Sequence, residues 1–261
     1  MMTQRKNAIV TGSTSGIGLG IATALAKKGM NVMLNGFGDT LVIEQIRKNL
    51  SDTYGVEVVY SAADMSCPQA IATMMEEALD TFGQIDVVVN NAGIQHVAPV
   101  DEFPTEKWDA IMSINLSSAF HTTKLALPGM KAQGWGRIIN LASAHGLVAS
   151  PYKSAYVAAK HGLVGFTKTV ALEAAEQGIT VNAICPGYVL TPLVEKQIPD
   201  TAQARGITED EVKRDVLLKA QPTKKFVTVE QLGEMVVFLC GDAAASMTGA
   251  ALPVDGGWTA Q

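Results

Sequence analysis

A tyrosine and a lysine four residues apart are the first residues in this chain whose spacing suggests chemistry. Tyr156 and Lys160 lie in the run Ser154-Ala-Tyr-Val-Ala-Ala-Lys160, where helical spacing places them on one face. A phenol is a poor base at neutral pH because its ordinary pKa is about 10. A nearby ammonium favours the phenolate and lowers that pKa, and the hydroxyl of Ser143 can donate to a substrate oxygen. Such a pair also occurs on ordinary helix surfaces, so this interpretation depends on motifs elsewhere.

A glycine-rich segment near the N-terminus is the second candidate site. The apolar run 7–11 precedes Gly12-Ser-Thr-Ser-Gly16-Ile-Gly18, and apolar residues at helix spacing follow. A strand, a glycine turn and a helix in this order direct free backbone N–H groups at a pyrophosphate. Gly12 permits the tight turn, Gly16 the approach to phosphate, and Gly18 the packing of helix on strand. The spacing departs from G-x-G-x-x-G, and a purely structural turn is the alternative.

Five motifs follow one another in a fixed order over nearly the whole chain. They are Thr11-Gly-x-x-x-Gly-x-Gly18, Asn90-Asn-Ala-Gly93, Ser143, Tyr156-x-x-x-Lys160 and Pro186-Gly187. Together they resemble the short-chain dehydrogenase/reductase family, and the combination is far more specific than any one motif. The resemblance implies a Rossmann-type fold, with Asn115, Ser143, Tyr156 and Lys160 as the catalytic residues.

Further segments are similar to one branch of that family, the bacterial D-3-hydroxybutyrate dehydrogenases. These segments are Ile94-Gln-His96, Ser143-Ala-His-Gly146, Lys153, Leu193-Val-Glu-Lys-Gln197 and Asp255-Gly-Gly-Trp258. This resemblance implies NAD-linked oxidation of 3-hydroxybutyrate to acetoacetate by a homotetramer.

Polar residues near the catalytic set predict a site for a small hydroxy acid. A carboxylate that leaves water needs charge-assisted partners. Candidates for this role, which we expect to converge on the substrate together with Ser143 and Tyr156, are Gln95, His145, Lys153 and Gln197. For each of them alone, a solvated surface position is the alternative. Trp258 is expected to close the pocket against the methyl group, from this chain or from a neighbouring subunit, and core packing is its alternative.

The expected cofactor is NAD, because no cation is placed to bind a 2′-phosphate. The glycine loop offers Ser13, Thr14 and Ser15, and the second strand ends in Asn35-Gly-Phe-Gly38. The acidic residue that often binds the ribose is also missing unless Asp39 reaches it. Phe37 is expected beside the adenosine, with a surface aromatic in a loop as the alternative. The family resemblance implies that Asp64 binds the adenine, and a helix-capping role is its alternative. The predicted cofactor-binding residues are Gly12, Thr14, Ser15, Gly16, Ile17, Gly18, Phe37, Ala63, Asp64, Met65, Asn91, Ala92, Gly93, Tyr156, Lys160, Pro186, Gly187, Val189 and Thr191.

Short apolar strands alternate with helical stretches, which predicts an α/β fold. Strands are expected at 7–11, 31–35, 56–61, 86–90, 136–142, 179–184 and 250–254. Helices are expected at 16–29, 40–53, 68–82, 105–132, 154–177 and 229–240. Continuous apolar strands are typical of a parallel sheet covered on both faces, here a doubly wound, seven-stranded, Rossmann-type sheet. We expect residues 1–261 to form one domain, with a mobile substrate lid at about 190–225.

Composition fits an enzyme of this kind without identifying it. A net charge of −5 with scattered cations argues against nucleic acid as a partner. No apolar run approaches the roughly 18 residues of a membrane span, and the polar start is unlike a signal peptide. The three cysteines are far apart in the sequence, which predicts reduced thiols and a cytoplasmic location. The four histidines have no metal-ligand spacing, so no metal site is expected.

Two other functions are compatible with this pattern. The first is reduction of bulkier 3-oxoacyl thioesters, which would favour NADP and an open pocket; the missing cation and Lys153 count against it. The second is a non-catalytic nucleotide sensor or scaffold, which should have lost part of the catalytic set. All four of those residues are present.

Overall fold

Seven parallel strands form the centre of the molecule. The computed structural model describes residues 5–191, 194–195, 198–199, 202–203 and 206–260. The strands are β1 Asn7–Val10, β2 Asn31–Asn35, β3 Val58–Ser61, β4 Val87–Asn90, β5 Gly136–Leu141, β6 Ile179–Pro186 and β7 Ala251–Val254. Their order, β3-β2-β1-β4-β5-β6-β7, reverses direction between β1 and β4, which confirms the predicted doubly wound sheet.

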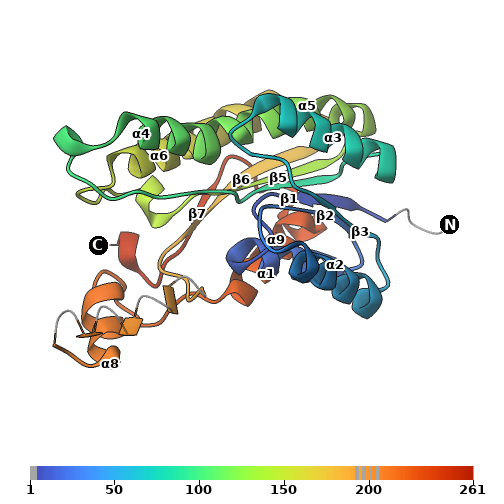
Figure 1. Cartoon of the computed structure of the whole chain (residues 1–261). Coiled ribbons are helices and arrows are strands. Elements are labelled where there is room, and N and C mark those ends of the chain that lie inside the picture. Colours follow the sequence, from blue (N-terminus) through green and yellow to red (C-terminus); the bar gives the residue numbers. More distant parts are fainter. Residues whose placement is uncertain (1–4, 192–193, 196–197, 200–201, 204–205, 261) are drawn as a thin grey trace.

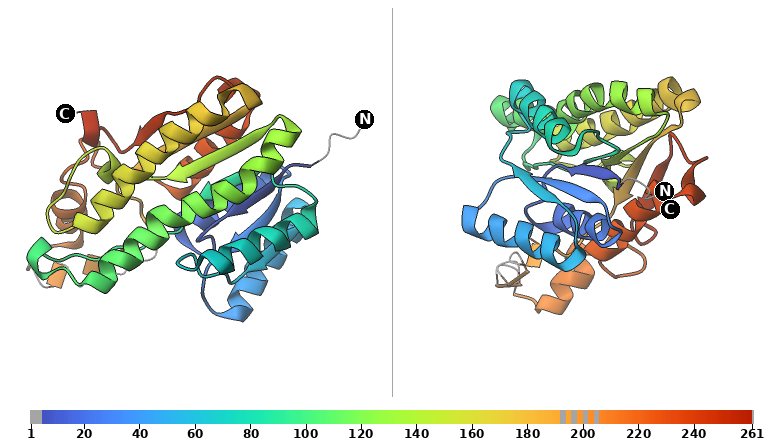
Figure 2. Two further views of the ribbon diagram at one scale, coloured as in Figure 1. Left: turned by 90° about the horizontal axis from the view of Figure 1, so that it is seen from above. Right: turned by 90° about the vertical axis from the view of Figure 1, so that its right-hand side faces the viewer.

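Helices cover both faces of the sheet (Figure 1). On one face lie α1 (Gly16–Lys27), α2 (Thr40–Tyr54) and α9 (Val229–Cys240). On the other lie α3 (Pro68–Phe82), α4 (Thr105–Met112), α5 (Ser118–Gln133) and α6 (Ser154–Ala174). Figure 2 shows α5 and α6 crossing this second face side by side. Among the helices of the described residues, none has both the length and the apolar character needed to cross a bilayer.

The apolar strands are buried on both faces, as the sequence predicts. In β4, Val87 and Val89 face the core beneath α1 and α9, whereas Val88 faces the core beneath α3 and α5. All three side chains are fully buried. The predicted helix at 105–132 is interrupted, because residues Ser113–Ser117 form a π-helical turn between α4 and α5. This turn carries Asn115, and such wide turns are frequent at functional sites.

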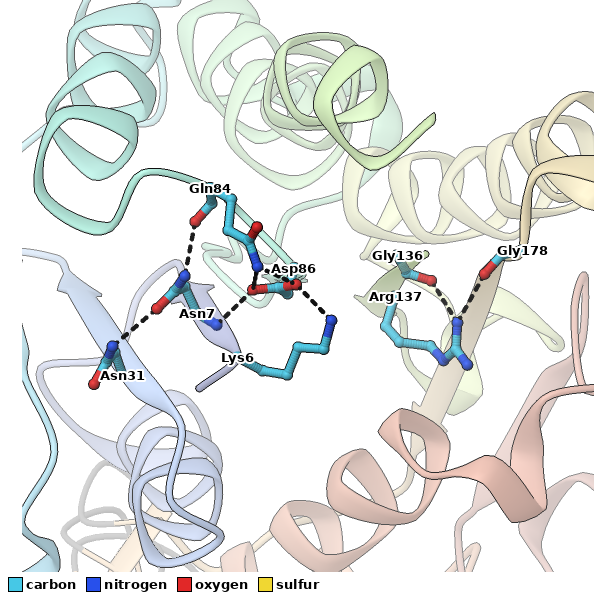
Figure 3. A network of polar contacts seen from close by, with 8 residues as sticks. All are labelled: Lys6, Asn7, Asn31, Gln84, Asp86, Gly136, Arg137 and Gly178. Carbon is cyan, nitrogen blue, oxygen red and sulfur yellow. Dashed lines mark hydrogen bonds and ion pairs between the residues drawn. The ribbon is translucent and has the colours of Figure 1, made fainter. Parts of the chain in front are cut away.

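The carboxyl ends of the strands share one edge of the sheet. The segment before α9, with the short helix α8 (Glu209–Glu211) and the π-helical turn Val212–Leu217, lies toward the same edge (Figure 1). At the opposite edge a polar network fastens the strand starts (Figure 3). The buried Asp86 carboxylate accepts from Lys6 Nζ and the Asn7 N–H, each at 2.9 Å, and from the Gln84 amide. Asp86 therefore organises the sheet away from the predicted site.

Replacing Asp86 with alanine should lower the stability of the protein without changing the predicted site at the opposite edge of the sheet. The Asn7 N–H would lose its acceptor in a buried place, which costs roughly 1–3 kcal/mol of unfolding free energy. Urea unfolding monitored by circular dichroism measures the loss. Glu44→Ala is the control, because it removes only ion pairs with Arg47 and Lys48 along one turn of α2 and should shift the midpoint far less. Equal shifts for the two variants would contradict a structural role for Asp86.

Candidate active site

The glycine loop is held against the end of β4 by side-chain hydrogen bonds. The Asn91 amide donates to the carbonyls of Thr11 at 2.8 Å and Gly12 at 2.9 Å. In return, the Thr11 hydroxyl accepts from the N–H groups of Asn91 and Ala92, both at 3.0 Å. The two motifs that the sequence places 80 residues apart therefore form one rigid corner.

The shape of this corner fits a pyrophosphate. Gly12 has φ +62°, and a Cβ there would lie 2.9 Å from the Ala92 Cα. A Cβ at Gly18 would collide with the Gly12 carbonyl oxygen, so the helix packs closely on the loop. Helix α1 begins at Gly16, its N-cap Ser15 makes no side-chain cap bond, and its first turn has no acidic residue. The first N–H groups of α1 therefore remain available for an anion, as in dinucleotide sites.

The expected adenosine end of the cofactor site is also ordered by local contacts. The Thr14 hydroxyl donates to the Phe37 carbonyl at 2.9 Å, and the Phe37 ring is exposed. Asp39 caps α2 by accepting from the N–H groups of Leu41 and Val42, which accounts for it without a ribose contact. The Asp64 carboxylate accepts from the N–H and from the hydroxyl of Ser66, and these two hydrogen bonds lower the pKa of the carboxyl. Asp64 therefore stabilises the turn before α3 rather than capping a helix.

Ser143 starts the short turn Ala144–Gly146 at the end of β5. Its hydroxyl oxygen accepts from the His145 N–H at 3.1 Å, so its own proton is left to point elsewhere. This turn packs against α6, because a Cβ at Gly146 would lie 2.9 Å from the Lys160 carbonyl oxygen. The packing brings Ser143 and His145 beside Tyr156, whose ring centroid lies 6.0 Å from that of His145.

The protonation of the central pair differs from the sequence-based expectation. Burial raises the pKa of Tyr156, and the Ser143 side chain is the group that lowers it. Lys160 does not lower it here: its Nζ donates to the Leu141 carbonyl at 2.6 Å and lies 5.6 Å from the Tyr156 ring centroid. Burial also lowers the pKa of Lys160 to about 8. The physical reason is that desolvation disfavours the charged form of each group.

Asn115 positions the loop that follows the Asn-Ala-Gly motif. Its side chain accepts from the Ile94 N–H and donates to the Ile94 carbonyl, each at 2.9 Å. Both bonds go to this loop, and none goes to the backbone of the helical turn that carries Asn115. The neighbouring Gln95 side chain is exposed, at the carboxyl edge of the sheet.

A row of aromatic rings extends from the catalytic tyrosine candidate. The rings of His145 and Trp258 lie nearly perpendicular to each other, with their centroids 5.0 Å apart. The rings of Trp258 and Tyr188 are stacked, with centroids 5.7 Å apart and an interplanar angle of 3°. Trp258 thus reaches the site within its own chain, in the turn Trp258–Ala260. Tyr188 is not among the residues predicted from the sequence, although its position directly after the Pro186-Gly187 motif indicates a place near the site.

The remaining predicted residues surround this row. Lys153 precedes α6 and lies near enough to His145 for its charge to lower the pKa of that imidazole. Thr191 lies against the glycine loop, 3.7 Å from a Cβ placed at Gly16, and Val189 pairs with Val227. The Gly187 N–H donates to the Val254 carbonyl and so continues the hydrogen bonding between β6 and β7. Gln197 lies outside the described residues. The described part of the chain holds no group of three potential metal ligands.

Known proteins match this chain over nearly its whole length. A family model described as enoyl-(acyl carrier protein) reductase matches residues 12–259. The D-beta-hydroxybutyrate dehydrogenase of Rhizobium meliloti strain 1021 is 60% identical over 98% of this chain and 99% of its own. That of Cupriavidus necator is 57% identical over all of both chains. The structure of L-sorbose reductase from Gluconobacter frateurii, with NADPH and L-sorbose, gives a TM-score of 0.93 at 32% identity, covering 99% and 98% of the two chains.

His145 should remain neutral in the folded protein at physiological pH. Burial, followed by the charge of Lys153, lowers its pKa to about 4. The unfolded chain takes up this proton near pH 6.5, so the contribution of His145 to stability is complete above that pH and is lost as pH falls toward 4. An NMR titration should show no His145 midpoint between about pH 5.5 and 8.

A matched pair of lysine variants tests the cause. Lys153→Ala should raise the His145 pKa, whereas Lys168→Ala, on the exposed side of α6, should leave it unchanged. An unchanged value in Lys153→Ala would mean that this ammonium points away from the pocket.

Proposed function

We propose that this chain, which belongs to the short-chain dehydrogenase/reductase family, oxidises D-3-hydroxybutyrate to acetoacetate with NAD. The two bacterial relatives, 60% and 57% identical over nearly the whole chain, are hydroxybutyrate dehydrogenases, which supports both an oxidoreductase acting on CH–OH groups and this substrate. The residues in the pocket must then perform two tasks. They must hold a small carboxylate, and they must remove the hydroxyl proton from the carbon that loses hydride.

The observation that carries this proposal is a partly buried lysine without a described acidic partner. Burial lowers the pKa of Lys153, and its side chain makes no hydrogen bond or ion pair with the described residues. A half-desolvated ammonium is costly unless an anion compensates it. A substrate carboxylate at Lys153 would offset that cost, and the neutral His145 beside it could donate a ring N–H. Gln95 and Gln197 complete the proposed carboxylate site.

Ser143 and Tyr156 are proposed to handle the alcohol proton. The Ser143 hydroxyl has a single proton, which is proposed to turn to the substrate oxygen while the hydroxyl oxygen keeps accepting from the His145 N–H. Tyr156 is the proposed general base, and NAD, when bound, would supply the hydride acceptor. Because burial raises the pKa of Tyr156 in the protein alone, this role requires that its phenolate becomes favoured once the pocket is filled. Lys160, with a pKa of about 8, is mostly protonated at neutral pH, so its ammonium is the group proposed to favour that phenolate. Asn115 holds the Ile94 loop and, by family resemblance, the water of a proton relay.

NAD rather than NADP remains a proposal supported by charge. No Lys or Arg occurs at 12–18 or 35–46, the two segments nearest the expected ribose. The homotetramer and the cytoplasmic location also remain predictions. Exposed apolar side chains on α5 and α6, including Phe120 and Leu172, are compatible with a subunit interface.

The alternative reactions are less well supported. The 3-oxoacyl-[acyl-carrier-protein] reductase FabG of Staphylococcus aureus is 34% identical to this chain, well below the hydroxybutyrate dehydrogenases. A bulky thioester would also have no carboxylate for Lys153. A nucleotide sensor without activity would not need the grouping of Ser143, Tyr156 and Lys160.

A substrate and cofactor matrix tests the proposed function. The parent enzyme should oxidise D-3-hydroxybutyrate with NAD, and should be much slower with the L-isomer or with NADP. Tyr156→Phe should lose activity by at least about a hundredfold, the lower end of the contribution of a general base, while still binding NAD. Tyr152→Phe removes an exposed phenol four residues away and is the control. Equal specificity constants for NAD and NADP, or an active Tyr156→Phe, would contradict the corresponding part of the proposal.

A second experiment asks whether Lys153 binds charge. Lys153→Ala should lower kcat/KM for 3-hydroxybutyrate by about one to two orders of magnitude, which is the loss of a charge-assisted contact. NAD affinity should hardly change. The methyl ester should be a poor substrate for the parent and be much less affected by the substitution.

Lys168→Ala, on the same helix, serves as the control and should behave as the parent with both substrates. If acid and ester lose activity by the same factor in Lys153→Ala, this lysine does not recognise the carboxylate.

A further inference from the structure

A buried glutamine joins the end of the expected lid to the substrate side of the site. Gln221 is fully buried and follows the π-helical turn Val212–Leu217. Its backbone is fixed by bonds from its N–H to the Leu218 carbonyl and from the Lys224 N–H to its own carbonyl, at 3.1 and 3.0 Å. Lys224, in the left-handed region at φ +52°, also donates its Nζ to the carbonyls of Leu218 and Lys219, the two residues that follow that turn. The glutamine therefore projects from a well-defined corner.

The side-chain amide of Gln221 uses both of its ends. Its Oε1 accepts from the N–H of Tyr188, and its Nε2 donates to the Lys225 carbonyl at 2.8 Å. It fills space left by two glycines: a Cβ at Gly187 would overlap its Oε1, and a Cβ at Gly256 would lie 3.2 Å from its Nε2. One amide group thus bonds the loop after β6 to the segment before α9, and it packs against Gly256 in the loop after β7.

These two loops carry the rings that stack on each other. The Tyr188 backbone is held on both sides, because its carbonyl accepts from the Val227 N–H at 3.0 Å. Trp258 is presented by Asp255, whose carboxylate accepts from the Gly257 N–H and from the N–H and hydroxyl of Thr259. Because these backbones are fixed, the rings of Tyr188 and Trp258 lie parallel, and the rings of Trp258 and His145 lie nearly perpendicular.

We propose that Gln221 is a positioning residue that limits the carbon-chain length of the substrate. It holds Tyr188 against Trp258, and these two rings form the wall that a longer hydroxy acid would have to displace. The inference deepens the proposed function and rests on it. Gln221 does not touch the reacting atoms, so its effect should appear in substrate discrimination and KM rather than in the proton-transfer step.

The test compares two shape-matched substitutions of buried amides. Gln221→Met removes both hydrogen bonds at nearly constant volume. Asn182→Leu does the same in β6, where Asn182 bonds Met247 and Ala250 away from the aromatic wall. The parent and both variants are assayed with D-3-hydroxybutyrate and D-3-hydroxyhexanoate. We expect Gln221→Met to reduce the preference for the shorter acid about tenfold, mainly through KM, with little change in the pH profile of kcat.

Asn182→Leu should lower stability but keep the parental preference. Gln221→Glu retains the acceptor for the Tyr188 N–H, and it should recover part of the discrimination if Gln221→Met folds poorly. A folded Gln221→Met with the parental preference, or an equal loss of preference in Asn182→Leu, would overturn the proposal.

A spectroscopic readout separates this inference from the proposed function. The stacked Tyr188–Trp258 pair should give a near-ultraviolet circular dichroism band that disappears in Trp258→Phe. Gln221→Met should weaken the same band, whereas Asn182→Leu should not, whichever substrate the enzyme turns over. A parent that oxidises neither acid would refute the hydroxy-acid assignment, while the band would still report on Gln221. An unchanged band in Gln221→Met would refute the positioning role alone.

Discussion

The hydrogen bond between Asn90 and Asn140 is the interaction on which the geometry of the site depends. These residues face each other in the paired strands β4 and β5, with Nδ2 of one 2.8 Å from Oδ1 of the other. Thr122 on α5 and Thr167 on α6 bond the remaining amide atoms. A register slip of one residue would leave all of these buried groups unpaired, which costs more than the bonds contribute. The loops that carry Asn91 and Ser143 therefore leave the sheet at the same level.

Burial has a larger effect on protonation in this site than any single ion pair. It lowers the pKa of His145 and Lys160 and raises that of Tyr156, so each shift is towards the neutral form. At neutral pH His145 and Tyr156 are therefore neutral, whereas Lys160, with a pKa of about 8, is still mostly protonated. Lys153 is only partly buried, and its ammonium suits a carboxylate.

The substrate side of the site is assembled from segments that are far apart in sequence. Ser143 follows the end of a buried strand, Tyr156 and Lys160 lie on α6, and Asn115 lies in the π-helical turn between α4 and α5. Packing of these elements limits the movement of the catalytic candidates. The Tyr188 and Trp258 rings depend instead on the loops after β6 and β7, where Gln221 holds the Tyr188 backbone and Asp255 holds the turn that carries Trp258. The catalytic candidates and the Tyr188–Trp258 rings are therefore held in place by two separate sets of contacts.

The sequence by itself determined the strands, the glycine loop and the Tyr156–Lys160 pair, because apolar runs, turn glycines and helical spacing are local signals. Only the tertiary structure decided that Tyr188 stacks on Trp258, that Gln221 bonds Tyr188, and that burial raises the pKa of Tyr156. Spacing along the chain predicts which groups share a helix face. It cannot predict desolvation or contacts between distant loops, because these depend on how the elements pack around one another.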